Sequence, residues 1–103
     1  MSVKVNRENQ NRHIPSSTGY IKGRSQLFGS LDDAQKLINE LSGTGKPIII
    51  NGKWKHKERV SASKVIGVYI NPETGEAKRT NKAIIVYSKT GSHIYPRKPK
   101  KGE

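Results

Sequence analysis

The sequence predicts a single α+β domain, with N-terminal helical segments packed on a C-terminal antiparallel β-sheet of four to five strands. Residues 31–41 repeat apolar side chains at helical spacing, whereas after Gly45 they come in short runs separated by turn formers. The 103 residues suffice for one core, and the composition does not shift along the chain. We expect the domain over residues 13–96, between an N-terminal arm (1–12) and a basic disordered tail (97–103).

The first quarter of the chain carries little regular pattern. Residues 2–12 are polar, which predicts a loose arm or at most a short helix. Residues 13–25 follow as a loop rich in turn formers, and a loop of this length in a small domain is often functional. The one clear helix begins after Ser30, which forms a capping box with Asp33, and it ends before Gly43. Its apolar stripe predicts that it packs on the sheet.

The rest of the chain predicts strands, at residues 47–50, 57–62, 65–70, 76–80, 83–88 and 92–95. A three-residue loop with Gly91 in the left-handed conformation is expected to join the last two. If Ser88 pairs with Ser92 across that loop, Tyr87, His93 and Tyr95 share one face of the sheet. Val86 and Ile94 then point to the other face, towards the helix.

Charge is the strongest compositional signal. The chain has 20 Lys and Arg against 8 Asp and Glu, a formal net charge of +12, which indicates a polyanionic partner. Nucleic acid is favoured over an anionic membrane or an acidic protein. The absence of cysteine excludes disulfides, cysteine-bound zinc and thiol nucleophiles. No run approaches 18 apolar residues, so we expect no membrane insertion by this domain and a monomer.

The scattered positions of the acidic residues in the sequence decide whether a metal-dependent reaction is expected. No carboxylates or histidines cluster at ligand spacing, so we expect no metal and no cofactor. Without a metal, RNA is an easier substrate than DNA, because the 2′-OH is a nucleophile beside each phosphate. The protein then needs a general base, a general acid and cations for the phosphorane.

Candidate residues follow from these needs. His13 lies in the long loop, His93 lies on a strand, and His56 is interpreted as an exposed bystander among lysines. Arg24 lies between Gly23 and Ser25, a combination suited to gripping phosphate. We expect His13, His93, Arg24 and Lys53 to be catalytic, and Ser25, Lys22, Tyr87, Ser92, Tyr95 and Trp54 to bind substrate. For Trp54 a buried core position is the equal alternative to stacking on a base.

An ordered series of short motifs gives the chain a family resemblance. It is similar to the bacterial polymorphic toxin type 50 domain in HIP at 13–15, GRS at 23–25, GTGKP at 43–47, NGKW at 51–54, VIG at 65–67, NPETG at 71–75 and YSKTGSHIYP at 87–96. The resemblance covers nearly the whole domain. Ser92 stands where threonine is more frequent, which retains a hydroxyl.

The resemblance implies an RNase with the BECR fold, that of barnase, EndoU, the colicin RNases and RelE. Catalytic residues are then expected on the open face of the sheet, with His13, Arg24, Ser25, Lys53 and His93 at the motif positions. It further implies the C-terminal effector of a secreted toxin or of a phage head-associated protein, delivered to act in the target-cell cytoplasm.

The sequence thus favours a metal-independent ribonuclease that leaves a 2′,3′-cyclic phosphate, with tRNA one possible RNA partner. Because such an activity must be neutralised in the producing cell, we expect a cognate immunity protein of acidic charge. The alternative is a non-catalytic nucleic-acid-binding module of a phage or toxin protein. A DNase is the third reading, which the missing carboxylate cluster disfavours.

Overall fold

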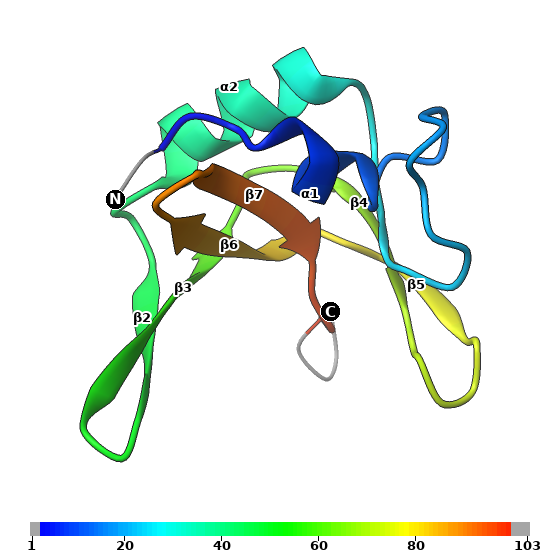
Figure 1. Ribbon diagram of the computed structural model, residues 1–103. Coiled ribbons are helices and arrows are strands. Elements are labelled where there is room, and N and C mark those ends of the chain that lie inside the picture. Colours follow the sequence, from blue (N-terminus) through cyan, green and yellow to red (C-terminus); the bar gives the residue numbers. More distant parts are fainter. Residues whose placement is uncertain (1–2, 100–103) are drawn as a thin grey trace.

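A computed structural model describes residues 3–99, and within that range it contains two helices and seven strands (Figure 1). In chain order these are α1 (Arg7–Asn11), β1 (Gln26–Leu27), α2 (Leu31–Leu41), β2 (Lys46–Ile50), β3 (Lys53–Ser61), β4 (Gly67–Ile70), β5 (Ala77–Thr80), β6 (Lys82–Ser88) and β7 (Gly91–Pro96). The α+β class is therefore confirmed.

The strands form two antiparallel sheets, where a single sheet of four to five strands was expected. One sheet has the order β2-β3-β6-β7 and the other β1-β4-β5. The single-sheet prediction failed because β4 pairs with β1, a two-residue strand too short for its pattern to be recognised. The sheets meet where Gly67 approaches Pro96 so closely that a Cβ there would lie 2.7 Å from the proline ring.

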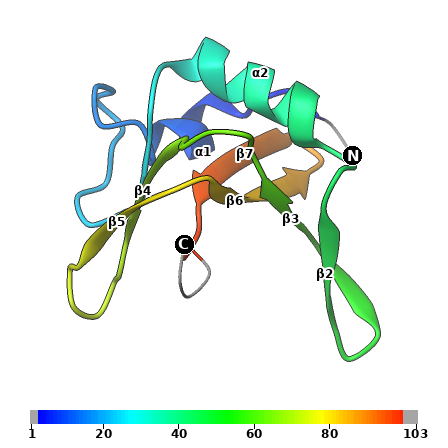
Figure 2. The same cartoon turned by 180° about the vertical axis from the view of Figure 1, so that it is seen from behind.

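Helix α2 lies across one face of the four-stranded sheet, and the β2–β3 and β4–β5 hairpins extend on the opposite side (Figures 1 and 2). The expected capping box of Ser30 and Asp33 starts the helix, and Ser42 caps its end. Ala34, Ile38 and Leu41 share one buried cluster with core residues of the sheet. We call the sheet face that carries α2 the core face, and the other the open face.

The register of β6 and β7 differs by one residue from the one expected. Ser88 pairs with Gly91, so the loop has two residues, and Val86, not Tyr87, lies opposite His93. A one-residue slip moves side chains to the other face of a strand. The predicted placement of Tyr87 and Val86 is therefore wrong: Tyr87 belongs to the buried core, and Val86 shares the open face with His93.

The N-terminal segment pairs with the outer edge of β7. It runs parallel to β7, with Ser92 N–H donating to Lys4 O at 2.8 Å and Asn6 N–H donating to Ser92 O at 2.7 Å. Gly91 leaves room for it, because a Cβ there would lie 2.8 Å from Lys4 O. The predicted short helix exists as α1, and Gln10 within it is fully buried.

The Gln10 amide continues the pairing of the β7 edge. Its Nε2 donates to Ile94 O at 2.8 Å, and its Oε1 accepts from Ile94 N at 2.7 Å. A side chain thus takes the place of a neighbouring strand. At the other end, Arg97 N–H donates to Lys82 O at 3.0 Å, while residues 100–103 of the predicted tail lie outside the described residues.

We expect Gln10→Ala to lower the free energy of unfolding by about 2–4 kcal/mol, because it leaves the buried N–H and C=O of Ile94 without partners. The matched control is Arg7→Ala on the same helix, an exposed change expected to cost less than ~0.5 kcal/mol. Urea denaturation compares the two. Equal midpoints would show that Gln10 does not anchor β7.

Candidate functional site

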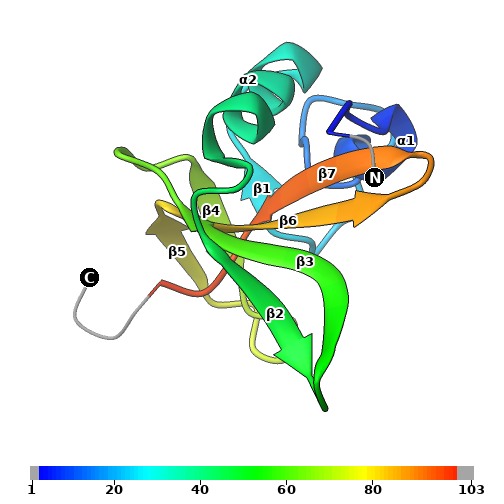
Figure 3. The same ribbon diagram turned by 90° about the vertical axis from the view of Figure 1, so that its left-hand side faces the viewer.

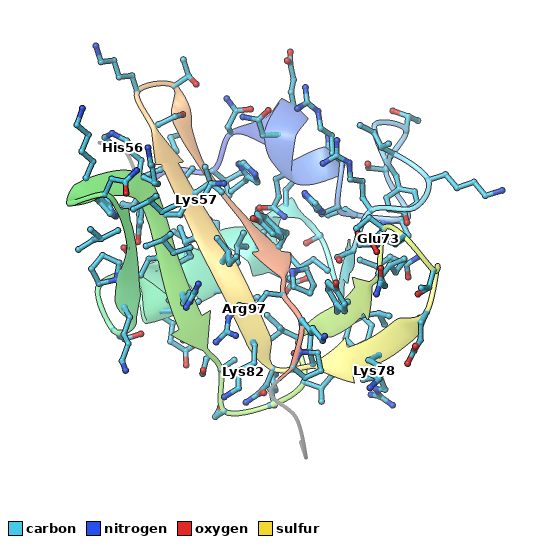
Figure 4. The ribbon with its side chains drawn as sticks, turned by 90° about the horizontal axis from the view of Figure 1, so that it is seen from below. His56, Lys57, Glu73, Lys78, Lys82 and Arg97 are labelled. Atoms are coloured by element: carbon cyan, nitrogen blue, oxygen red, sulfur yellow. The ribbon has the colours of Figure 1, made fainter. Side chains whose placement is uncertain are left out.

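The open face of the four-stranded sheet carries its side chains in three rows, because directly paired residues of antiparallel strands point to the same face. The rows are Lys57–Val86–His93, Arg59–Ile84–Tyr95, and Ser61–Lys82, which Arg97 extends. Each row contains a cation. Figure 4 views this side of the molecule, with Lys57, Lys82 and Arg97 labelled.

Four of the eight acidic side chains lie on the other side of the sheet. Asp32, Asp33 and Glu40 belong to α2. Glu58 alternates with Lys57 and Arg59 along β3, so it turns to the core face, where its carboxylate accepts from Gly43 N, Gly45 N and the Tyr87 hydroxyl. Burial alone would raise the pKa of Glu58, but these donors together hold it below its usual value. The open face is thereby left positive.

Three rings gather at the edge of this face. The His13 ring lies 6.0 Å from His93 with 12° between the planes, and 5.1 Å from Tyr95 with 17°. His93 and Tyr95 come from β7, whereas His13 follows α1 directly. Because Gln10 fixes α1 to Ile94, the strand residue between His93 and Tyr95, the same contact brings His13 to the two rings.

Ser25 fixes the orientation of His13. The Nδ1 of His13 lies 3.0 Å from the Ser25 carbonyl oxygen. A carbonyl can only accept, so Nδ1 carries the proton and the neutral ring keeps an unprotonated Nε2. The Ser25 hydroxyl meanwhile accepts from Ile70 N at 3.0 Å, which ties the loop to β4. Ser25 is therefore a positioning residue for His13.

A cleft opens beside His13, between this loop, the β4–β5 turn and the end of β7. Its volume is about 330 Å³, and its lining includes His13, Arg24, Tyr69, Pro72, Tyr95 and Arg97. Arg24 is exposed, and its carbonyl accepts from the Tyr20 hydroxyl at 2.9 Å, so the loop has internal support. The cleft therefore combines aromatic, apolar and cationic groups.

Both histidines are held in the neutral form. Burial lowers the pKa of His93 to about 4, and His13, Arg12 and Lys57 add to the effect. Burial likewise lowers the pKa of His13, with Arg24 and Arg12 contributing and the Ser25 carbonyl opposing. Burial raises the pKa of Tyr95, although Arg24 opposes the shift. The pair is therefore uncharged at neutral pH until an anion approaches.

Five of the candidate residues come together in the structure. His13, His93 and Tyr95 form the ring cluster, and Arg24 and Ser25 join His13 at the cleft. Lys22 is exposed on the same loop but does not line the cleft.

Two candidates lie elsewhere in the sheet. Tyr87 and Ser92 are directly paired on the core face, where Ser92 is fully buried and Tyr87 bonds to Ser42 and Glu58. The predicted open-face position of Tyr87 is corrected accordingly. Both residues pack on the core side of the sheet and do not border the ring cluster.

Lys53 and Trp54 also lie apart from the cluster. They belong to the part of β3 that precedes Lys57, the first β3 residue that pairs with β6. The β2–β3 hairpin therefore extends beyond the rest of the sheet (Figure 3). Trp54 is 42% exposed, which corrects the alternative of a core anchor, and its indole N–H donates to Lys57 O at 3.0 Å. His56, the expected bystander, is exposed and packs on the Trp54 ring.

Sequence reasoning missed three residues that surround the cluster. Lys57 was not among the predicted site residues, although the alternation of Lys57 and Arg59 with Glu58 and Val60 indicates a two-faced strand. Tyr69 and Arg97 had no local signal, because β4 and the residues after β7 meet at the cleft only through the fold.

Two further observations concern metal-binding groups and membrane-spanning helices among the described residues. Among residues 3–99, no three histidine or acidic side chains gather into a group that could hold a metal ion. Neither helix in that range is long and apolar enough to cross a membrane.

Comparison with models of protein families identifies a match. The model of a family described as bacterial toxin 50 matches residues 5–96, a span that includes α1 and every strand. No curated protein matches the chain. The matched range includes Gln10, both clustered histidines and the cleft.

We expect the His93 imidazole to titrate at about pH 4 in NMR spectra, and His13→Asn to raise that value because it removes a nearby ring that becomes cationic. Between an ordinary pKa of 6.5 and about 4 the unfolded chain binds more protons at His93 than the folded one. The free energy of unfolding should therefore fall as pH drops through this window. A midpoint near 6.5 that His13→Asn leaves unchanged would contradict the buried, coupled pair.

Proposed function

The chain belongs to the bacterial toxin 50 family, and we propose that this toxin domain is a metal-independent ribonuclease whose active site is the His13–His93 pair on the open face. The observation that carries the proposal is the pairing of two histidines from distant parts of the chain amid cations. One imidazole can accept the 2′-OH proton while the other donates a proton to the leaving 5′-oxygen.

The surrounding charges fit the requirements of this reaction. The phosphorane formed by attack of the 2′-oxygen carries extra negative charge, and Arg12, Arg24 and Lys57 act on the two imidazoles from nearby. Substrate binding also helps to prepare the acid. A phosphodiester beside the rings adds a negative charge, which favours the imidazolium and raises the lowered histidine pKa values. Proton uptake would thus accompany RNA binding.

No step of this reaction calls for a metal, because the nucleophile is part of the substrate. The product ends would be a 2′,3′-cyclic phosphate and a 5′-hydroxyl. The match to a bacterial toxin family supports delivery as an effector. We further propose that the domain has the BECR fold and that its parent is a polymorphic toxin or a phage protein.

The main rival is a non-catalytic nucleic-acid-binding module. The cations in the three rows of the open face would favour RNA binding whether or not cleavage follows. A binding module, however, gives no reason for two stacked, desolvated histidines. A DNase would have no neighbouring 2′-OH, so digestion of RNA and DNA side by side separates all three.

We expect the purified domain to cleave RNA in excess EDTA and to leave 2′,3′-cyclic phosphate ends, because the 2′-OH replaces an activated water. Mass spectrometry of the fragments identifies the ends, and DNA of the same sequence is the matched control. Activity that disappears on chelation and returns with Mg²⁺ or Zn²⁺ would contradict the metal-free mechanism.

A second test separates catalysis from binding. We expect His93→Ala to reduce single-turnover cleavage by ~10²–10⁴-fold, the range for losing a general acid or base. RNA affinity and the thermal midpoint should change little, since His93 is only partly buried and other residues supply the cations. Lys36→Ala, exposed on α2, is the control. A lower midpoint with unchanged activity per folded molecule would make His93 a packing residue.

A further inference from the structure

The position of His13 in the cleft and of His93 outside it suggests a direction for the bound RNA. His13 lines the cleft of about 330 Å³, whereas His93 does not. The His13 ring also lies 6.0 Å from the His93 ring, which belongs to the row that holds Lys57. A ligand bound in the cleft therefore contacts His13, and a part that extends beyond the cleft reaches His93 past the His13 and Tyr95 rings.

The cleft has the size and the lining for one nucleoside. Its volume lies at the low end of the range for small-molecule sites, ~300–1,000 Å³. Tyr69 and Tyr95 offer aromatic rings on which a base can stack, and Arg24 and Arg97 offer charge for the adjoining phosphate. Protein sites for single-stranded RNA combine these groups.

The hydrogen bonding of His13 identifies its chemical role. Because Nδ1–H donates to the Ser25 carbonyl at 3.0 Å, the neutral ring presents an acceptor at Nε2. The Ser25 carbonyl also favours the imidazolium that forms once Nε2 takes a proton. His13 is therefore equipped as a base, and the nucleoside in the cleft is the one whose ribose it meets.

We propose that the cleft binds the nucleoside on the 5′ side of the scissile phosphate, with its base between Tyr69 and Tyr95. This inference rests on the proposed ribonuclease function. His13 is then the general base and His93 the general acid. His13 Nε2 takes the 2′-OH proton, the 2′-oxygen bonds to phosphorus, the bond from phosphorus to the 5′-oxygen breaks, and that oxygen takes a proton from His93. The 3′ product leaves past Lys57. The substrate is RNA whose nucleotide at the cleavage position is unpaired, since its base must leave the stack.

The role of each histidine is tested with an oligonucleotide that has sulfur in place of the bridging 5′-oxygen at the cleavage site. A thiolate leaves without a general acid, so the substrate bypasses the residue that protonates the leaving group. We expect His93→Ala to lose ~10²–10⁴-fold on the oxygen substrate and to come within about tenfold of the wild type on the sulfur substrate. His13→Asn should stay impaired on both.

Asparagine is the informative change at His13, because its amide can still donate to the Ser25 carbonyl while Nε2 is lost. The retained hydrogen bond limits the risk that a variant at this buried position unfolds, and circular dichroism checks the fold. Rescue of His13→Asn, of both variants, or of neither would overturn the assignment. Wild-type protein that does not cleave RNA at all would instead refute the proposed function.

The nucleoside site has its own test. Removing the base on the 5′ side of the scissile phosphate should lower kcat/KM of the wild type on the order of tenfold to a hundredfold, the effect of a stacked base. Tyr69→Leu should be less sensitive to that removal than the wild type, because one of the two rings that hold the base is already missing. A substrate that lacks the base on the 3′ side is the control, and the absence of that base should affect both proteins equally. Tyr69→Leu that remains as sensitive as the wild type to loss of the 5′ base would overturn the site.

Discussion

The contact between the Gln10 amide and the backbone of Ile94 controls the arrangement of the candidate site. Its two hydrogen bonds, at 2.7 and 2.8 Å, fasten α1 to the edge of β7. His13 lies three residues beyond Gln10, and His93 and Tyr95 flank Ile94, so a single anchor sets the distance between residues 80 positions apart. The pairing of Lys4 and Asn6 with Ser92 extends the same anchor along the strand. The N-terminal segment is thus a structural part of the domain.

A second constraint is the separation of charge by the alternation of β3. Glu58 and Val60 face the core, whereas Lys57 and Arg59 face outwards. Burying a carboxylate is costly unless it is well bonded, and Glu58 accepts from two backbone amides and the Tyr87 hydroxyl. Burial and that bond raise the pKa of Tyr87 to about 12, so the hydroxyl remains a donor. The Glu58 carboxylate thus holds the loop after α2 through the amides of Gly43 and Gly45. Because it faces the core, it does not offset the cations of the open face.

Much of the fold could be predicted from local sequence, because α2 and the longer strands carry strong periodic patterns and a capping box. The register of β6 and β7 was predicted one residue out, and the segment that pairs with the outer edge of β7 lies more than 80 residues away and has a polar sequence without a strand pattern. That slip reversed the faces of Tyr87 and Val86. His93 and Tyr95 were nevertheless expected on the face away from the helix, since Ile94 between them is apolar and buried.

The candidate site was predictable only in part, for a similar reason. His13, Arg24 and His93 stand out by chemistry and by motif, and the structure brings them near one another. Lys53 was chosen for the turn beside it, but the ladder between β3 and β6 ends at Lys57, which leaves Lys53 on the overhang. Which lysine reaches the histidines depends on where two strands stop pairing, and this is a property of the assembled sheet.

The charges that would attract RNA also restrain the chemistry until RNA is present. Burial makes protonation of both histidines unfavourable, and nearby cations add to the effect, Arg12 and Lys57 at His93 and Arg12 and Arg24 at His13. A phosphodiester that neutralises these cations weakens both effects at once, so binding and protonation favour each other. Cations that only bound phosphate would serve equally well anywhere on the open face. In the proposed reaction, their position around the two imidazoles would couple the arrival of the substrate to the supply of the acid.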